Sequence, residues 1–599
     1  MTTYQAPQRD MQFVMDEVLD FQSHYKNLPG CEDVTLELIS AIRTEGAKFT
    51  ESVLAPLYQS GDEEGCKWQD GDVTTPAGFK EAYQKFREAG WPTLTQPLEY
   101  GGQGLPTTIG TMFTEMVSAA NMPWSLINAT NSGTLETLHT WGSSAQKDIY
   151  MPKIVSGEWS GTMCLTEPHC GTDLGMLRTK AEPDSEGGYL VSGTKIFISE
   201  GEHDKTDNII HIVLARLPDA PAGVKGISLF IVPKFVVNEK GEKGERNAVS
   251  CGSLEHKMGL HGAPTCVMNF DSAKGYLIGP PNKGLNCMFT FMNNARLSAA
   301  VQGMIHSEVG FQNSLAYAKD RLQMRALSGA KNPELPADPI IVHPDVRRML
   351  LTQKSFSEGG RMLNYYISQL LDVIERSTDQ AAKKDADDTL GLLTPIAKAF
   401  LTETGCESAN LGLQCFGGHG YIREWGVEQN VRDARIGCIW EGTTGIQSLD
   451  LLARKILLTK GERLKNFTKK IHGFCEENKN NAAMDEFITE LAAHNKEWGE
   501  LTTKVAGAAL NNPDEVGAAS VDFLMYSGYL VLAYFWAQAV VAAQKALDGD
   551  TTEQDFYQAK IKTARFFYKR LLPKTRGHVA TMKAGADCLM NLEAEHFVF

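Results

Sequence analysis

The run Tyr189-Leu190-Val191 is followed by Ser192-Gly193 and then by Lys195-Ile196-Phe197-Ile198. Short runs of β-branched and aromatic residues interrupted by turn residues are typical of strands. Similar runs occupy residues 209–214, 227–232 and 266–270. This pattern of strand-like runs and turn residues predicts an antiparallel β unit of roughly one hundred residues between Gly161 and Gly279, with Ser192-Gly193 as one of its turns.

On both sides of this unit the apolar residues recur at helical intervals, from Leu36 to Ile154 and again from Phe289 to Leu458. The second stretch is broken by a loop, Ser328–Pro339, that contains three prolines. The order of elements does not alternate as in a doubly wound sheet. We therefore expect a mainly α chain with a central antiparallel β domain. The expected segments are a lead segment (1–34), an N-terminal helical domain (35–160), the central β domain (161–285), a helical bundle (286–460) and a C-terminal helical domain (461–599).

The C-terminal segment carries two further helical signals. Phe487, Leu491, His494, Trp498, Leu501 and Val505 follow intervals of four and three, which place them on one face of a helix. Residues 523–544 include no charged side chain and are long enough to span a bilayer. Because this stretch contains Ser527 and two glutamines and has no basic flank before it, we interpret it as a buried helix. A membrane-surface role is the alternative.

Composition narrows the function classes. The 599 residues include 73 acidic and 58 basic side chains, and the net charge of -15 argues against nucleic-acid binding. The 12 cysteines form no C-x-x-C pair, and His261 has no second ligand at metal spacing, so we expect a reduced compartment and no metal site. The N-terminal residues lack a secretory or transit pattern, which favours the cytoplasm. No Gly-x-Gly-x-x-Gly follows a predicted strand, so no nicotinamide or ATP fingerprint is present.

Three distant segments carry the chemistry. They are Thr166-Glu167-Pro168 followed by Gly171-Thr172-Asp173, then the run from Gln414 to Gly420, and then Trp440-Glu441-Gly442-Thr443 continuing to Gln447. Taken singly, each has an ordinary structural explanation: a turn before a strand, a helix C-cap, and an acid in the first turn of a helix. In this combination and order they resemble the acyl-CoA dehydrogenase family, over roughly Leu36 to Leu458. The lead segment and the C-terminal domain resemble the longer members of that family.

The resemblance implies a fold made of a helical domain, a β-barrel and a four-helix bundle, and an FAD-dependent reaction. Such enzymes remove hydrogens from the α and β carbons of an acyl-CoA thioester to give the trans-2-enoyl-CoA. Glu441 matches the base that takes the α-proton, while flavin N5 accepts the β-hydride. The chemistry requires a desolvated base and stabilisation of charge on the thioester carbonyl. Some relatives carry the base beside the residue matched by Arg296, but Ala295 occupies that neighbouring position here.

The resemblance also implies the ligand contacts. Phe197 stands where tryptophan is commoner, and Ser199 where threonine is commoner. Arg321 matches an arginine that binds the cofactor pyrophosphate from the neighbouring subunit, which implies a homodimer or a dimer of dimers. The implied FAD contacts are Met163, Leu165, Thr166, Gly171, Thr172, Phe197, Ser199, Arg321, Gln414, Gly417, Gly418 and Thr443. The implied substrate contacts are Thr172, Asn293, Arg296 and Gly442.

Further expectations concern the reaction partners. An electron-transfer flavoprotein is the expected electron acceptor, and fatty acid β-oxidation or related acyl-CoA breakdown the expected pathway. The acyl chain length is not readable from the sequence. An acyl-CoA oxidase, which passes electrons to molecular oxygen, is the nearest alternative. A non-catalytic CoA-binding or membrane-associated protein is the alternative of another class, and it predicts a colourless protein.

Overall fold

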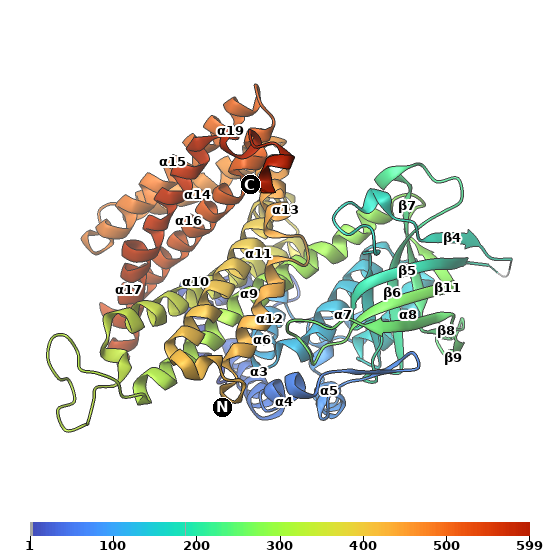
Figure 1. Cartoon of the computed structure of the whole chain (residues 1–599), viewed down its shortest axis with the longest axis horizontal. Coiled ribbons are helices and arrows are strands. Elements are labelled where there is room, and N and C mark those ends of the chain that lie inside the picture. Colours follow the sequence, from blue (N-terminus) through green and yellow to red (C-terminus); the bar gives the residue numbers. More distant parts are fainter. Residues whose placement is uncertain (1–3, 186, 599) are drawn as a thin grey trace. The chain divides into compact units, whose positions relative to one another are not determined.

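The computed structural model describes residues 4–185 and 187–598 (Figure 1). The chain forms two compact units. One comprises residues 45–298, and the other comprises residues 1–44 together with 299–599. Helix α9 (Gly284–Asp320) begins in the first unit and ends in the second.

The central β structure of the first unit is a small barrel. Strand pairing passes from β11 (Thr265–Ile278) to β5 (Tyr189–Ser199), β4 (Lys180–Pro183), β6 (Asn208–Arg216) and β7 (Ile227–Pro233), and returns to β11. A closed ring of strands leaves no open edge within the ring. Strands β10 (Val249–Leu254) and β3 (Trp159–Cys164) extend it on β11 and β6. The expected central β domain, with its barrel, is therefore confirmed.

Two details of the strand prediction were wrong. Ser192 and Gly193 are not a turn: they lie inside β5 and pair with neighbouring strands. Gly193 is nearly extended, at φ 156°, and a side chain there would clash with Thr179. The sheet is also not wholly antiparallel, because β3 runs parallel to β6 over Trp159–Cys164. Pairing between segments so distant in the chain leaves no mark on local periodicity.

Helices and two short strand pairs complete this unit. Apolar residues of α7 (Met122–Trp141), α8 (Ser144–Val155) and the start of α9 form a core against β3, β6 and β7, which includes Trp159, Ile212 and Phe291. The barrel interior holds a second core that includes Val191, Phe230 and Met268. The remaining elements are α4 (Leu57–Glu64), α5 (Phe79–Glu88), α6 (Thr107–Ala120), α7 (Met122–Trp141), α8 (Ser144–Val155), β1 (Lys67–Gln69), β2 (Asp72–Thr74), β8 (Phe235–Val237) and β9 (Lys243–Arg246).

The second unit is helical and is built around α9, α10 (Pro344–Arg376) and α11 (Gln380–Phe416). Helices α9 and α11 approach very closely where Gly303 meets Gly405, because a Cβ on Gly405 would lie 2.2 Å from the Gly303 carbonyl oxygen. After α11 come α12 (Val427–Arg435) and α13 (Thr444–Leu449). Before α9 the chain supplies α1 (Gln8–Gln12), α2 (Phe21–Lys26) and α3 (Leu36–Phe49).

The C-terminal helices pack against this bundle. The predicted stripe lies on α15 (Asp485–Ala509), where all its members except the partly exposed His494 are buried. The uncharged stretch lies in α16 (Asp514–Leu547), which is long and apolar enough to cross a membrane, yet 67% of its most apolar window is buried within the chain. Trp536 of α16 donates a hydrogen bond to the Ser355 carbonyl of α10 (3.2 Å). The buried-helix interpretation is thus confirmed. The other helices here are α14 (Glu462–Asn478), α17 (Gln554–Phe566), α18 (Thr575–Ala584) and α19 (Asp587–Met590).

A buried cluster of charges joins three parts of the helical unit. Asp10 of α1 contacts both Arg361 of α10 and Lys560 of α17. Arg361 also binds Glu308 of α9 at 2.9 Å, and Lys560 binds Glu358 of α10 at 2.9 Å. Burial raises the pKa of Asp10, but the two cations outweigh burial and hold this pKa well below its usual range. The lead segment and the C-terminal helices are therefore fixed to the bundle through its interior.

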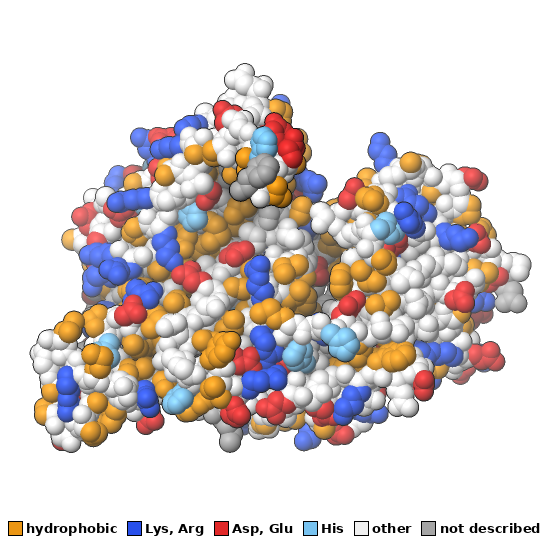
Figure 2. All heavy atoms as spheres, in the orientation of Figure 1, with side chains coloured by type: hydrophobic (Ala, Val, Ile, Leu, Met, Phe, Trp, Pro, Cys, Tyr) orange, Lys and Arg blue, Asp and Glu red, His pale blue; other side chains and the backbone are white. Residues whose placement is uncertain are grey.

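The surface does not offer one strongly basic face in the view of Figure 2, where acidic and basic side chains are interspersed. This agrees with the net negative charge of the chain.

Candidate active site

The first motif lies at the end of β3 and in the loop that follows. Met163 and Thr166 are partly exposed, and Leu165 is buried between them. The Thr166 carbonyl accepts a hydrogen bond from Ile196 of β5 (2.9 Å), so this loop is fastened to the strand that carries Phe197. The next turn closes through paired backbone bonds between Glu167 and Cys170, and it presents Gly171 and Thr172 to solvent.

Glu167, which the sequence analysis quoted only as part of the motif, anchors this loop. Its carboxylate accepts hydrogen bonds from Lys195 (2.9 Å), from the Thr179 hydroxyl (2.6 Å), and from the backbone N–H groups of Arg178 and Thr179. Burial raises the pKa of Glu167, but the Lys195 ammonium and these donors outweigh burial and lower it below the usual value. His169 and Cys170 lie near enough to complete a metal-ligand trio. The four donors already satisfy the carboxylate, so the geometry is that of a structural ion pair.

Phe197 is the most unusual residue of β5. It has a left-handed backbone (φ 59°), and 59% of its surface is exposed. A bulky residue in that region is strained, and a large exposed ring adds no core packing. The β5–β11 register shifts beside it, between the partners of Cys266 and Met268. Ser199, partly exposed, follows two residues later. The bulge therefore presents an aromatic ring outward beside the first motif, as a residue that stacks on a planar ligand would be presented.

The two predicted substrate residues on α9 differ in burial. Asn293 is exposed, whereas Arg296 is 7% exposed and its guanidinium lies 3.4 Å from the Asn293 side-chain oxygen. Asn294 between them donates to Ser132 of α7 (3.2 Å), which fixes this part of the helix. Ala295 is buried.

The second motif forms an exposed glycine turn at the end of α11. Gln414, Gly417 and Gly418 are exposed, and Gly417 has the positive φ (59°) that glycine adopts without strain. A Cβ at Gly417 or Gly418 would meet no atom within 4 Å, so the positive φ explains the glycine at 417, whereas no described neighbour requires one at 418. The space suits close approach of a ligand to the backbone.

Aromatic residues that the sequence analysis did not single out support this turn. Tyr317 stacks on Phe416 with ring centroids 4.2 Å apart, and its hydroxyl lies 2.9 Å from His419 Nδ1. Arg321, exposed, follows one helical turn after Tyr317, just beyond the end of α9. The predicted Arg321 and the glycine turn thus belong to one end of the α9–α11 pair.

The third motif holds Glu441 in a strained, partly exposed loop between α12 and α13. Glu441 has φ 53° and Gly442 has φ 90°, so two successive residues are left-handed. The Gln447 amide donates to the Glu441 carbonyl (2.9 Å), and the Thr443 hydroxyl caps α13 by accepting from Ile446 N–H (3.3 Å). Strain of this kind at a carboxylate is typical of functional positions.

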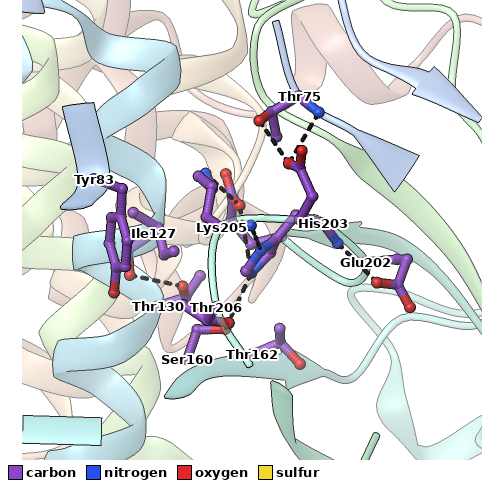
Figure 3. A network of polar contacts seen from close by, with 12 residues as sticks. Thr75, Tyr83, Ile127, Thr130, Ser160, Thr162, Glu202, His203, Lys205 and Thr206 are labelled. Carbon is purple, nitrogen blue, oxygen red and sulfur yellow. Dashed lines mark hydrogen bonds and ion pairs between the residues drawn. The ribbon is translucent and has the colours of Figure 1, made fainter. Parts of the chain in front are cut away.

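One buried polar cluster in the β unit resembles a serine–histidine nucleophile site (Figure 3). Its hydrogen-bond geometry does not fit that role. Ser160 Oγ lies 3.0 Å from His203 Nε2, and the Glu200 carboxylate is paired with Lys205 at 2.7 Å. The backbone N–H of Lys205 donates to His203 Nδ1. The proton of the neutral ring is therefore on Nε2, which donates to the serine hydroxyl. Burial also lowers the pKa of His203 well below its usual value. This histidine cannot take a proton from Ser160 in that state.

The loop before α10 is compact, because it is folded around one carboxylate. The Asp338 side chain is fully buried and accepts hydrogen bonds from the N–H groups of Ala326, Lys331 and Asn332. Arg325, at 3.4 Å, adds an ion pair, and Leu322 and Pro339 form a β-bridge at the base. The polar and proline-rich composition of 328–339 identified the loop but not this organisation.

Comparison with protein families matches nearly the whole chain. The matches are the acyl-CoA dehydrogenase N-terminal domain (37–158), middle domain (162–273) and C-terminal domain (282–457), followed by the acetyl-CoA dehydrogenase C-terminal like domain (467–593). The 3-methylmercaptopropionyl-CoA dehydrogenase of Ruegeria pomeroyi is 41% identical over 98% of this chain and 99% of its own length. A butyryl-CoA dehydrogenase of Syntrophomonas wolfei is 35% identical over 99% of both chains.

Solved structures share the fold. Caenorhabditis elegans ACDH-11, in complex with C11-CoA, superposes with a TM-score of 0.77 at 18% identity, covering 98% of this chain and 96% of its own. An acyl-CoA dehydrogenase from Bacillus anthracis, complexed with FAD, gives 0.73 at 21% identity, covering 96% and 92%.

Proposed function

Because this chain belongs to the acyl-CoA dehydrogenase family of flavoprotein oxidoreductases, we propose that it converts an acyl-CoA thioester to the trans-2-enoyl-CoA, with Glu441 as the base. FAD is the cofactor expected for the family, and when bound it supplies the acceptor for the β-hydride. The observation that carries the assignment of the base is the left-handed Glu441–Gly442 pair, held by hydrogen bonds at the position that matches the family's catalytic glutamate.

The role of Glu441 follows from its surroundings. The carboxylate removes the α-proton as negative charge develops on the thioester carbonyl. The N–H of a residue in this loop can then donate to that oxygen, and Gly442 offers no side chain that would obstruct the thioester. Backbone strain fixes the direction of the side chain before substrate arrives, which reduces the entropy cost of reaching the reactive geometry.

Two independent features of the structure fit the binding of FAD. Phe197 exposes an aromatic ring at the bulge of β5, and Gly417 and Gly418 leave open space above the α11 turn. We assign the flavin end of the cofactor to the first group. The adenosine and pyrophosphate end is assigned to the second group as contributed by the neighbouring subunit. The first group comprises Met163, Leu165, Thr166, Gly171, Thr172, Phe197 and Ser199; the second comprises Arg321, Gln414, Gly417 and Gly418, with Thr443 as a further contact.

The substrate is proposed to be a short acyl-CoA, because the two similar relatives above are named for butyryl-CoA and 3-methylmercaptopropionyl-CoA. Asn293 and Arg296 are assigned to the CoA nucleotide, and Thr172 and Gly442 to the remainder of the thioester. We further propose that the protein is a cytoplasmic homodimer or dimer of dimers. It passes electrons to an electron-transfer flavoprotein and acts in acyl-CoA catabolism.

The test replaces Glu441 with glutamine, which keeps the shape and removes the basic oxygen. Purified E441Q should retain yellow FAD at the wild-type ratio, while flavin bleaching by butyryl-CoA or 3-methylmercaptopropionyl-CoA falls by at least about a thousandfold. Glu403→Gln, a neighbouring carboxylate that accepts from Thr444 (2.5 Å), is the matched control and should bleach far faster than E441Q. Bleaching by E441Q within tenfold of wild type would remove Glu441 from this role. Peroxide formed in step with turnover would instead identify an oxidase.

A further inference from the structure

A fully buried lysine holds both ends of the Glu441 segment. Lys398 of α11 is 0% exposed, and its Nζ donates to the Gly437 carbonyl (2.8 Å) and to the Gly442 carbonyl (2.6 Å). These two carbonyls bracket Glu441 in sequence. Nothing in the sequence distinguishes Lys398, because a lysine within a long helix is usually a solvated surface residue.

The bracket explains how two successive left-handed residues persist. Glu441 and Gly442 are costly to hold at φ 53° and 90° unless the surrounding structure determines them. Lys398 fixes the carbonyls before and after the base, and Gln447, also fully buried, fixes the Glu441 carbonyl itself at 2.9 Å. Thr402, one turn along α11, packs against Gly437 and donates to the Lys398 carbonyl at 2.9 Å.

The geometry requires a donor with at least two N–H groups. One Nζ reaches two backbone carbonyls, which an amino group can do and a hydroxyl with one donor cannot. Burying a polar group costs free energy unless it is hydrogen-bonded, so an apolar side chain would be the ordinary choice at a position that served only to fill space. Two hydrogen bonds from one fully buried side chain suit a loop that must keep its conformation.

We propose that Lys398 is a positioning residue that sets the direction of the Glu441 carboxylate through the backbone of its loop. The inference rests on the proposed function of Glu441 and assigns Lys398 no contact with substrate or cofactor. Gln447 acts in the same way on the Glu441 carbonyl, through one hydrogen bond.

The main test compares Lys398→Met with wild type in the FAD-loaded enzyme. Methionine keeps most of the length and packing but donates no hydrogen bond. K398M should retain FAD and raise KM for butyryl-CoA less than threefold, while kcat falls about a hundredfold, the loss typical of a reactive group displaced by about 1 Å. The kinetic isotope effect with α-deuterated butyryl-CoA should rise, because proton removal becomes more rate-limiting. A merely structural defect would change FAD content and stability without raising the isotope effect.

Two controls keep the test sharp. Thr404→Val alters another buried residue of α11, whose hydroxyl donates only within its own helix, to Phe400 (2.8 Å) and Leu401 (3.4 Å), and it should leave kcat unchanged. In a double-mutant cycle, K398M should have little effect on the residual rate of E441Q, because a misdirected base and an absent base give the same result.

The outcomes separate this inference from the proposed function. If E441Q is inactive while K398M keeps kcat within threefold of wild type, the positioning role of Lys398 is wrong and that of Glu441 stands. If E441Q remains active, the proposed function itself fails. Should K398M not fold, Gln447→Leu provides the test. A kcat lowered at least about tenfold, with FAD retained and an increased isotope effect, would show that these side chains position Glu441 through its loop. An unchanged kcat would overturn the proposal.

Discussion

At the scale of single residues, two buried lysines hold the loops that carry the sequence motifs, and their positions in the sequence do not indicate this role. Lys195 lies inside the β unit on Glu167, and Lys398 lies beneath the Glu441 loop. Both residues read as ordinary polar positions in the sequence, since nothing in local periodicity distinguishes a buried lysine from a solvated one. Sequence motifs identified Phe197, Gly417 and Glu441, which have positive φ angles and are at least partly exposed, whereas the residues that support them became visible only in three dimensions.

Replacing Lys195 by methionine should destabilise the β unit strongly, because the Glu167 carboxylate would stay buried without its cation. The expected loss is about 3–5 kcal/mol, measured by urea unfolding at neutral pH. The matched control is Lys180→Met, since Lys180 forms an exposed pair with Glu182 at 2.9 Å and should change stability little. Equal effects of the two substitutions would contradict the role assigned to the buried pair.

At the scale of elements, amphipathic periodicity predicted the helices well and strand pairing poorly. The stripe on α15 and the apolar interior of α16 were predicted because burial of one face imposes a local pattern. The parallel pairing of β3 with β6 and the continuation of β5 through Gly193 were not, because both depend on contacts between distant segments. Glycine within a run suggested a turn, but here it admits Thr179 beside the strand.

The loop before α10 offers an element-scale prediction. Asp338→Ala removes the acceptor of three backbone N–H groups, so residues 326–337 should open without unfolding the bundle. Limited proteolysis should cleave the variant within this loop at least about tenfold faster than wild type, while the melting temperature changes by only a few degrees. Glu334→Ala, an exposed position in the same loop, serves as the control. Unchanged cleavage would show that Asp338 does not organise the loop.

At the scale of the whole molecule, buried neutral histidines couple stability to pH. Burial lowers the pKa of His211 to about 3 and that of His306 to about 4, and it also lowers the pKa of His203 well below its usual value. In the unfolded chain these groups bind protons below about pH 6.5. The unfolded state therefore binds more protons than the folded state, and stability falls as pH decreases from about 6.5 towards 4.

The size of this effect can be measured one histidine at a time. Each buried histidine should contribute a slope of up to about 1.4 kcal/mol per pH unit between pH 6 and 5. His306→Gln should therefore lower the proton uptake on urea unfolding at pH 5.5 by nearly one proton, even if its absolute stability is lower. Identical uptake by wild type and His306→Gln would contradict the neutral state of His306.

The charge cluster around Asp10 has a consequence for biosynthesis. Asp10 leaves the ribosome before Lys560, which is 550 positions later in the chain. Until that lysine emerges, the nascent interior holds the carboxylates of Asp10, Glu308 and Glu358 against fewer cations. Final closure of the helical unit must therefore wait until α17 has been translated. Ribosome-stalled chains that end before α17 should remain open to protease around Asp10, and release of the finished polypeptide should protect that segment.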